Sequence, residues 1–235
     1  GIRVDGAPQP PLTLDGLAGA AAVAVSPDGE HVYIAGETDD GVAVFTRDAG
    51  DDGRLAFKES KIAGVGGIVG LQGAQGLALS SDDRHVYVTS SVDDAIAVFE
   101  RNVDSGDFAN FGRVTQIQVV DGIPGLDRAM EIAASSDASD TAGSRHLYVT
   151  GHTADSLLVF DRNVELASDD FGQLTLVQSF KDGVDGVDGR DARNLPTQEL
   201  TSRDSEIAFG YGRAVTEALS IGMVAIDQDS VSLST

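Results

Sequence analysis

Short runs in which every second residue is apolar recur along the chain, separated by Gly, Asp and Ser residues. Alternation with a period of two, interrupted by turn-forming residues, is typical of consecutive antiparallel β-strands. In the first part of the chain the runs are Ala21–Ser26, His31–Gly36, Gly41–Arg47 and Leu55–Ile62. The pattern therefore predicts an all-β fold whose unit is a sheet of four antiparallel strands.

This unit is repeated. Gly16–Phe45 reads GLAGAAAVAVSPDGEHVYIAGETDDGVAVF and aligns without a gap with Gly70–Phe99, GLQGAQGLALSSDDRHVYVTSSVDDAIAVF. A third copy, Gly125–Phe160, has a six-residue insertion between its first and second strands. The landmarks that recur are His31, His85 and His146, then Tyr33, Tyr87 and Tyr148, then Phe45, Phe99 and Phe160. Four strands in a repeat of this length form one β-propeller blade, and a histidine found once per blade indicates a structural role. The shared register predicts that the recurring Tyr and Phe residues pack in equivalent environments between neighbouring sheets.

The repeat divides the chain into blades. We expect blade 1 at residues 16–69, blade 2 at 70–124 and blade 3 at 125–189. Residues 1–15 are expected to form the outer closing strand of a neighbouring or last blade. Residues 190–235 are expected to be a degenerate fourth blade, with strands at Ile207–Phe209 and Ala218–Ile221, or a tail. Blades bury their faces against one another, so this arc is a partial ring, or one completed by a second copy or by a longer parent chain.

Composition narrows the classes of partner. Asp and Glu number 38 against 16 Lys and Arg, giving a net charge of -22, which repels nucleic acid and favours cations and basic partners. The absence of Cys excludes disulfides, zinc-thiolate sites and a cysteine nucleophile. No apolar stretch approaches the length of a membrane span. The chain begins at Gly1 without Met, as a processed piece would, and we expect an extracellular or periplasmic location.

Four strings carry a family resemblance: SPDGEHVYIAG, DDGVAVFTRD, SSDDRHVYVTS and DDAIAVFERN. They are similar to the repeats of the lactonase-like, YVTN-type seven-bladed propellers. That superfamily includes 6-phosphogluconolactonases and muconate-cyclising enzymes, and also secreted and surface modules with no known reaction. The resemblance implies blade geometry over roughly residues 10–189, about half the usual number of blades. It leaves open whether the chain is an enzyme.

Carboxylates recur in the turns between second and third strands, which meet at one rim of a propeller. They are Glu37, Asp39, Asp40, Asp93, Asp94 and Asp155. Calcium takes six to eight oxygen ligands of this kind, so the rim is a candidate cation site, although no cofactor is required. The alternative is a set of solvated turns, because Asp-Asp and Asp-Gly are common turn formers.

The third copy departs from the repeat beside the expected channel. Arg128 replaces the glycine found as Gly19 and Gly73, and Glu131 replaces the small residues Ala22 and Gly76. With His152 on the same rim, Glu131 and Arg128 form an acid/base and clamp set suited to a lactone carbonyl. The alternative is a structural Arg128–Glu131 ion pair.

Other catalytic signatures are absent from the sequence, which has no phosphate-binding loop, no G-x-S-x-G elbow and no H-E-x-x-H. We therefore expect a binding or scaffolding propeller whose acidic rim holds a cation, a partner protein or a small molecule. The alternative function is a lactone hydrolase or cycloisomerase acting through Glu131, Arg128 and His152.

Overall fold

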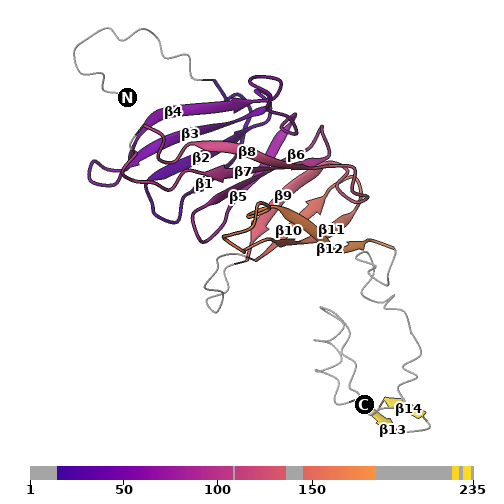
Figure 1. Ribbon diagram of the computed structural model, residues 1–235. Coiled ribbons are helices and arrows are strands. Elements are labelled where there is room, and N and C mark those ends of the chain that lie inside the picture. Colours follow the sequence, from indigo (N-terminus) through magenta and orange to yellow (C-terminus); the bar gives the residue numbers. More distant parts are fainter. Residues whose placement is uncertain (1–14, 108, 136–144, 184–223, 228–229, 234–235) are drawn as a thin grey trace. The chain divides into compact units, whose positions relative to one another are not determined.

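Three sheets of four antiparallel strands make up most of the described chain (Figure 1). The computed structural model describes residues 15–107, 109–135, 145–183, 224–227 and 230–233. Blade 1 contains β1 (Ala20–Val25), β2 (His31–Gly36), β3 (Gly41–Asp48) and β4 (Arg54–Ile62). Blade 2 contains β5 (Ala74–Leu79), β6 (His85–Ser90), β7 (Ala95–Arg101) and β8 (Val114–Val120). Blade 3 contains β9 (Ala129–Ala134), β10 (His146–Gly151), β11 (Ser156–Arg162) and β12 (Leu174–Lys181).

Each sheet follows chain order, so every blade is a meander of hairpins. The observed strands of blade 1 differ from the predicted ones by at most one residue at either end. Turn residues determine where the strands end. Gly29, for example, has a φ of 76° in the β1–β2 turn, a conformation in which glycine has no steric penalty. The predicted all-β propeller fold is confirmed.

The chain divides into two compact units, residues 1–179 and 180–235. The first holds the three blades apart from the last two residues of β12, and the first strands β1, β5 and β9 lie next to one another in turn. In the second, the described residues form a hairpin of β13 (Val224–Asp227) and β14 (Ser230–Leu233). The strands expected at residues 207–209 and 218–221 lie outside the described residues, as do residues 1–14.

The core lies between blades. One apolar cluster joins blades 1 and 2 and includes Tyr33 and Phe99, while a second joins blades 2 and 3 and includes Tyr87 and Phe160. The repeated tyrosine faces the blade that follows it. Tyr33 and Tyr87 are therefore fully buried, whereas Tyr148, with no following blade in the described part of the chain, is 41% exposed. The expectation of equivalent environments for all three tyrosines was wrong for this reason.

Candidate functional site

The turns between second and third strands have one shared conformation in the three blades. Asp40, Asp94 and Asp155 occupy the same turn position with φ of 52°, 52° and 49°. Aspartate is among the few residues that tolerate this left-handed region. The left-handed backbone of these turns therefore explains why Asp recurs on this rim, and the recurrence also makes the rim negatively charged.

The rim carboxylates hold neighbouring backbone in place. Asp40 accepts the N–H of Gly73 at 2.7 Å, and Asp94 accepts the N–H of Arg128 at 2.6 Å, so each links its turn to the next blade. Asp39 accepts the N–H groups of Gly16 and Ala18, both at 2.8 Å.

In blade 2, Asp93 occupies the position of Asp39 and accepts the N–H of Gln72 at 3.0 Å. Hydrogen bonds from backbone N–H groups, that of Ala18 first, lower the pKa of the Asp39 carboxyl. Glu37 and Asp155 are exposed.

Among the described residues, no group of three or more His, Asp or Glu side chains is arranged to hold a metal ion. The calcium site remains a prediction. A pocket of about 540 Å³ does lie on this rim, between blades 2 and 3, and four carboxylates line it. These are Asp93, Asp94, Asp121 and Asp127.

Arg128 and His152 are adjacent on the same rim. Arg128 has a φ of 53°, close to the 67° of Gly19 and Gly73, the glycines that it replaces. Its N–H is held by Asp94, and its carbonyl accepts the N–H of His152 at 3.0 Å. A left-handed conformation at a residue other than glycine costs about 1–2 kcal/mol, so the structure retains arginine here despite strain.

Glu131 lies on β9, the innermost strand of blade 3, where its N–H donates to Thr150 Oγ1 at 3.1 Å. The side chains of Arg128, Glu131 and His152 are all exposed. No ion pair joins Arg128 to Glu131 among the described residues. The described residues therefore do not show the expected structural ion pair, and the catalytic roles of Arg128, Glu131 and His152 stay predictions.

Sequence reasoning missed a buried arginine between blades. Arg101, at the end of β7, is 2% exposed and enters blade 1, where its Nε donates to Tyr33 Oη at 2.7 Å. Its Nη2 lies 2.6 Å from Asp28 Oδ2 and 3.0 Å from His31 Nδ1. Since arginine only donates hydrogen bonds, the Nδ1 of His31 must accept, and the neutral ring carries its proton on Nε2.

The junction between blades 2 and 3 repeats this arrangement. Arg162, at the end of β11, is 1% exposed, pairs with Asp82 and lies 2.9 Å from His85 Nδ1. Phe111 and Phe171 lie edge-on to His31 and His85, with ring centroids 4.7 and 4.8 Å apart. The sequence did contain a signal, because an arginine follows each landmark Phe by two residues, at Arg47, Arg101 and Arg162.

Burial in these clusters shifts the pKa values of the titratable groups. Burial, then the charge of the neighbouring arginine, lowers the pKa of His31 and of His85 to about 4. Burial also raises the pKa of Asp83 to about 6, although Arg101 opposes the shift. At Asp28, burial is outweighed by hydrogen bonds from Ser26, Glu30 and Arg101, which lower the pKa to about 2. The arginine and histidine side chains of these clusters are almost fully buried, which indicates a structural role.

Comparison with known proteins agrees with this geometry. The family described as "Lactonase, 7-bladed beta-propeller" matches residues 3–118. The periplasmic gluconolactonase of Pseudomonas aeruginosa is 25% identical, with a TM-score of 0.52 over 71% of this chain and 40% of that one. No curated protein matches the chain.

Two further solved structures show the fold alone. A candidate 6-phosphogluconolactonase from Bacteroides uniformis is 18% identical, with a TM-score of 0.53 over 71% of this chain and 42% of its own. A Desulfotomaculum acetoxidans protein of unknown function is 21% identical, with a TM-score of 0.52 over 70% and 43%. The chain thus spans about two fifths of the length of each. The resemblance to lactonase-like propellers is confirmed, and the described residues contain no helix that could span a membrane.

Proposed function

We propose that these blades belong to a lactone hydrolase of the lactonase-like propeller type, with blade 3 contributing catalytic groups. The observation that carries the proposal is that two charged residues of blade 3, Arg128 and Glu131, stand where blades 1 and 2 have glycine or alanine, in a chain whose similar proteins include a gluconolactonase. Residues that obey the repeat hold blades together, so departures from it are the positions free to act. That neighbour is periplasmic, and an exported location is proposed here on the same basis.

The reaction requires three tasks of the protein. A water oxygen adds to the lactone carbonyl carbon, the ring C–O bond breaks, and the ring oxygen takes up a proton, giving a hydroxy acid. Glu131 is assigned to accept the proton of the water, and Arg128 to stabilise the negative charge on the carbonyl oxygen. His152 is assigned to deliver the proton to the ring oxygen. Hydrogen bonds to Asp94 and His152 fix the backbone of Arg128, which supports a positioned charge.

Glu131→Gln is the direct test, with a sugar lactone such as gluconolactone as substrate and the uncatalysed opening subtracted. Loss of a general base lowers kcat by about 10²–10⁴-fold, and the melting temperature should not change because Glu131 is exposed. The matched control is Glu165→Gln. This exposed glutamate lies in the β11–β12 loop, at the opposite end of β11 from the turn that holds His152. Equal turnover by both variants, or none by the unaltered protein, would refute the proposal.

A second candidate is a binding module that uses the acidic rim. The pocket lined by Asp93, Asp94, Asp121 and Asp127 favours it, because the negative charge around this pocket attracts a cation or a basic segment of a partner. Melting with calcium and with chelator is the test, since a ligand of the native state stabilises it in proportion to the logarithm of its free concentration. Asp94→Asn and Asp93→Asn should reduce such a shift, whereas Glu131→Gln should not.

A further inference from the structure

Both internal junctions of the arc use the same contacts. An arginine at the end of one blade's third strand enters the His-Tyr pair of the preceding blade, as Arg101 and Arg162 do. The outer strands also join: Glu59 accepts the N–H of Val114 at 2.7 Å, and Gln118 accepts the N–H of Leu174 at 2.7 Å. The junction therefore has an entering half and a receiving half.

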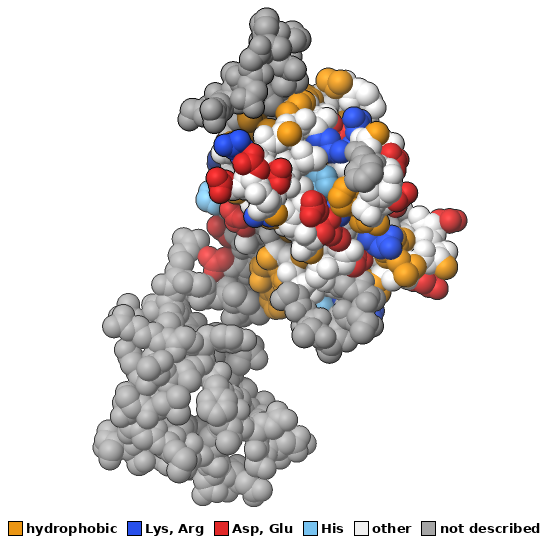
Figure 2. All heavy atoms as spheres, turned by 90° about the vertical axis from the view of Figure 1, so that its left-hand side faces the viewer, with side chains coloured by type: hydrophobic (Ala, Val, Ile, Leu, Met, Phe, Trp, Pro, Cys, Tyr) orange, Lys and Arg blue, Asp and Glu red, His pale blue; other side chains and the backbone are white. Residues whose placement is uncertain are grey.

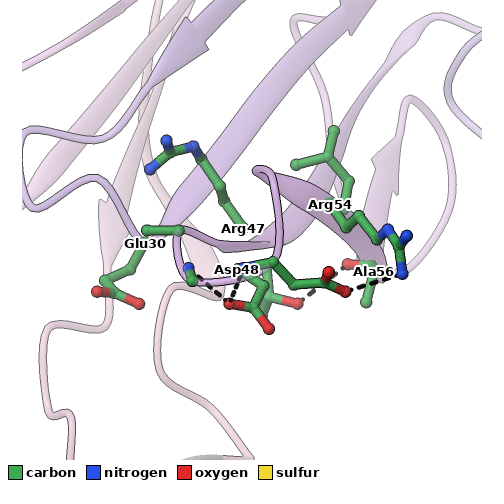
Figure 3. A pocket seen from close by; sticks show the side chains of 10 residues that line it. Glu30, Arg47, Asp48, Arg54 and Ala56 are labelled. Carbon is green, nitrogen blue, oxygen red and sulfur yellow. Dashed lines mark hydrogen bonds and ion pairs between the residues drawn. The ribbon is translucent and has the colours of Figure 1, made fainter.

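Blade 1 has the entering half of such a junction on the face that points away from blade 2. Arg47 Nη1 donates to the carbonyl of Gly29 at 2.9 Å, as Arg101 Nη1 donates to that of Asp83 at 3.0 Å. In Figure 3, Arg47 and Arg54 point to different sides of a pocket of about 540 Å³ at this loop. The Arg47 guanidinium thus makes the same backbone hydrogen bond as that of Arg101, which enters a neighbouring blade.

A vacant space beside Gly53 matches the position of a neighbour's histidine. Gly112 and Gly172 lie so close to the rings of His31 and His85 that a Cβ would stand about 2 Å from Nε2. At Gly53, with a similar φ of 72°, the Arg47 guanidinium is the only described group that a Cβ would meet, at 3.6 Å. Blade 1 keeps the glycine that the junction needs, with no histidine in place among the described residues.

Apolar positions of this junction are exposed on blade 1. Hydrophobic side chains are also visible among acidic and basic ones on the surface drawn in Figure 2. Val23 is 66% exposed, while the equivalent Leu77 and Ile132 are 9% and 7% exposed. Leu55 is 48% exposed, whereas the equivalent Val114 is 1% exposed. Side chains that blades 2 and 3 bury in a junction are therefore exposed to solvent on blade 1.

Blade 3 presents the receiving half. Tyr148 is 41% exposed and His146 half-buried, whereas their counterparts in blades 1 and 2 are buried. Leu157 is 40% exposed, while the equivalent Val42 and Ile96 are fully buried. Gln178, which occupies the position of Gln118 in the outer strand, is exposed as well.

We propose that a second copy of this chain docks head to tail, so that its Arg47 enters between His146 and Tyr148 of the first. The arginine of one face, the His-Tyr pair of the other and the exposed apolar positions of both correspond to the contacts of the two junctions within the chain. Asp52 replaces the phenylalanine of the other blades at this joint, so a carboxylate, rather than a ring, faces His146. The contact joins different surfaces of the two copies, so it closes a ring or extends further. The proposal is independent of lactone hydrolysis.

The test is the mass of the full chain in solution, measured by light scattering over a range of concentrations. We expect a particle larger than the 24.3 kDa monomer. Arg47→Glu should dissociate it, because the arginine donors to His146 and Tyr148 would be lost and a carboxylate, which donates no hydrogen bond, would be buried in their place. The matched control is Arg54→Glu at the start of β4, an exposed arginine that pairs with Asp51, and its mass should equal that of the unaltered chain.

A mixing experiment keeps the test decisive if one variant folds poorly. Arg47→Glu removes the entering half, and Tyr148→Asp removes the receiving half. Each variant alone should be monomeric with an unchanged far-ultraviolet circular dichroism spectrum, and their 1:1 mixture should form a dimer through the remaining intact pair of faces. If the unaltered chain is monomeric, other segments of the same chain cover these faces, and the proposal is overturned. Association that survives Arg47→Glu would overturn it as well.

Discussion

A single arginine per blade junction satisfies polar groups that would otherwise be buried without partners. Arg101 contacts Tyr33, His31 and Asp28 at once, and Asp83 Oδ1 lies 3.0 Å from its Nη1. Breaking a buried ion pair is costlier than never forming one, since the remaining charge stays desolvated. The arginine is therefore more important for stability than a surface arginine.

We expect Arg101→Ala to lower the free energy of unfolding by about 3–5 kcal/mol, as for other buried pairs that lose one partner. Urea denaturation measures this. Arg54→Ala is the control, because its ion pair with Asp51 is more than half exposed on both sides, and exposed pairs contribute about 0–1 kcal/mol. Similar losses in the two variants would show that the Arg101 cluster contributes no more than a surface pair.

His85 should make the protein less stable in mild acid. Its pKa is about 4 in the folded chain against an ordinary value of 6.5, so between these values the unfolded chain binds a proton that the native state does not. The free energy of unfolding should therefore fall as pH falls from 6.5 towards 4, by up to about 1.4 kcal/mol per pH unit. Asp83, whose pKa is raised to about 6, acts in the opposite direction within the other cluster.

Denaturation between pH 4.5 and 7 can separate these contributions. His85→Gln keeps an acceptor for Arg162 but cannot take up the proton, so its stability should depend less on pH than that of the unaltered chain. An unchanged pH dependence would show that His85 is not buried in its neutral form. Above pH 7 the two proteins should respond alike.

At the scale of strands and turns, local pattern predicted most of what is observed. The repeat placed the strands of blade 1 to within one residue and placed the Asp turns on one rim. It could not show that Asp40 and Asp94 cap the next blade, because that contact joins residues more than 30 positions apart. The Arg101 cluster was missed for the same reason: Arg101 and His31 are 70 residues apart.

Phe99 tests the packing of these elements. It is fully buried in the cluster between blades 1 and 2, so Phe99→Ala should cost about 3–5 kcal/mol through lost burial and the cavity left behind. Leu166→Ala, at a residue 70% exposed, should change stability by no more than about 0.5 kcal/mol. A loss below about 1 kcal/mol for Phe99→Ala would place that ring at a position able to relax.

At the scale of the whole molecule, residues that recur in every blade and residues that differ between blades have different roles. Repeated residues account for the blades and their junctions, whereas Arg128 and Glu131 have no counterpart in the other two blades. Alignment of the three repeats is enough to reveal this difference, but it does not reveal that Arg128 retains the left-handed backbone of the glycines it replaces. An arginine kept in a strained conformation, without an ion pair to Glu131, is consistent with the proposed role of Arg128 in lactone opening.

Arg128→Gly tests that claim most directly, because it restores the residue found at this position in the other blades. Relief of strain should leave the melting temperature unchanged or raise it by about 2–4 °C. The hydrogen bond from the residue 128 N–H to Asp94 can remain. We predict that kcat/KM for lactone opening falls at least about 100-fold, as when one donor to a developing oxyanion is removed. Full turnover in the Arg128→Gly protein would contradict the account.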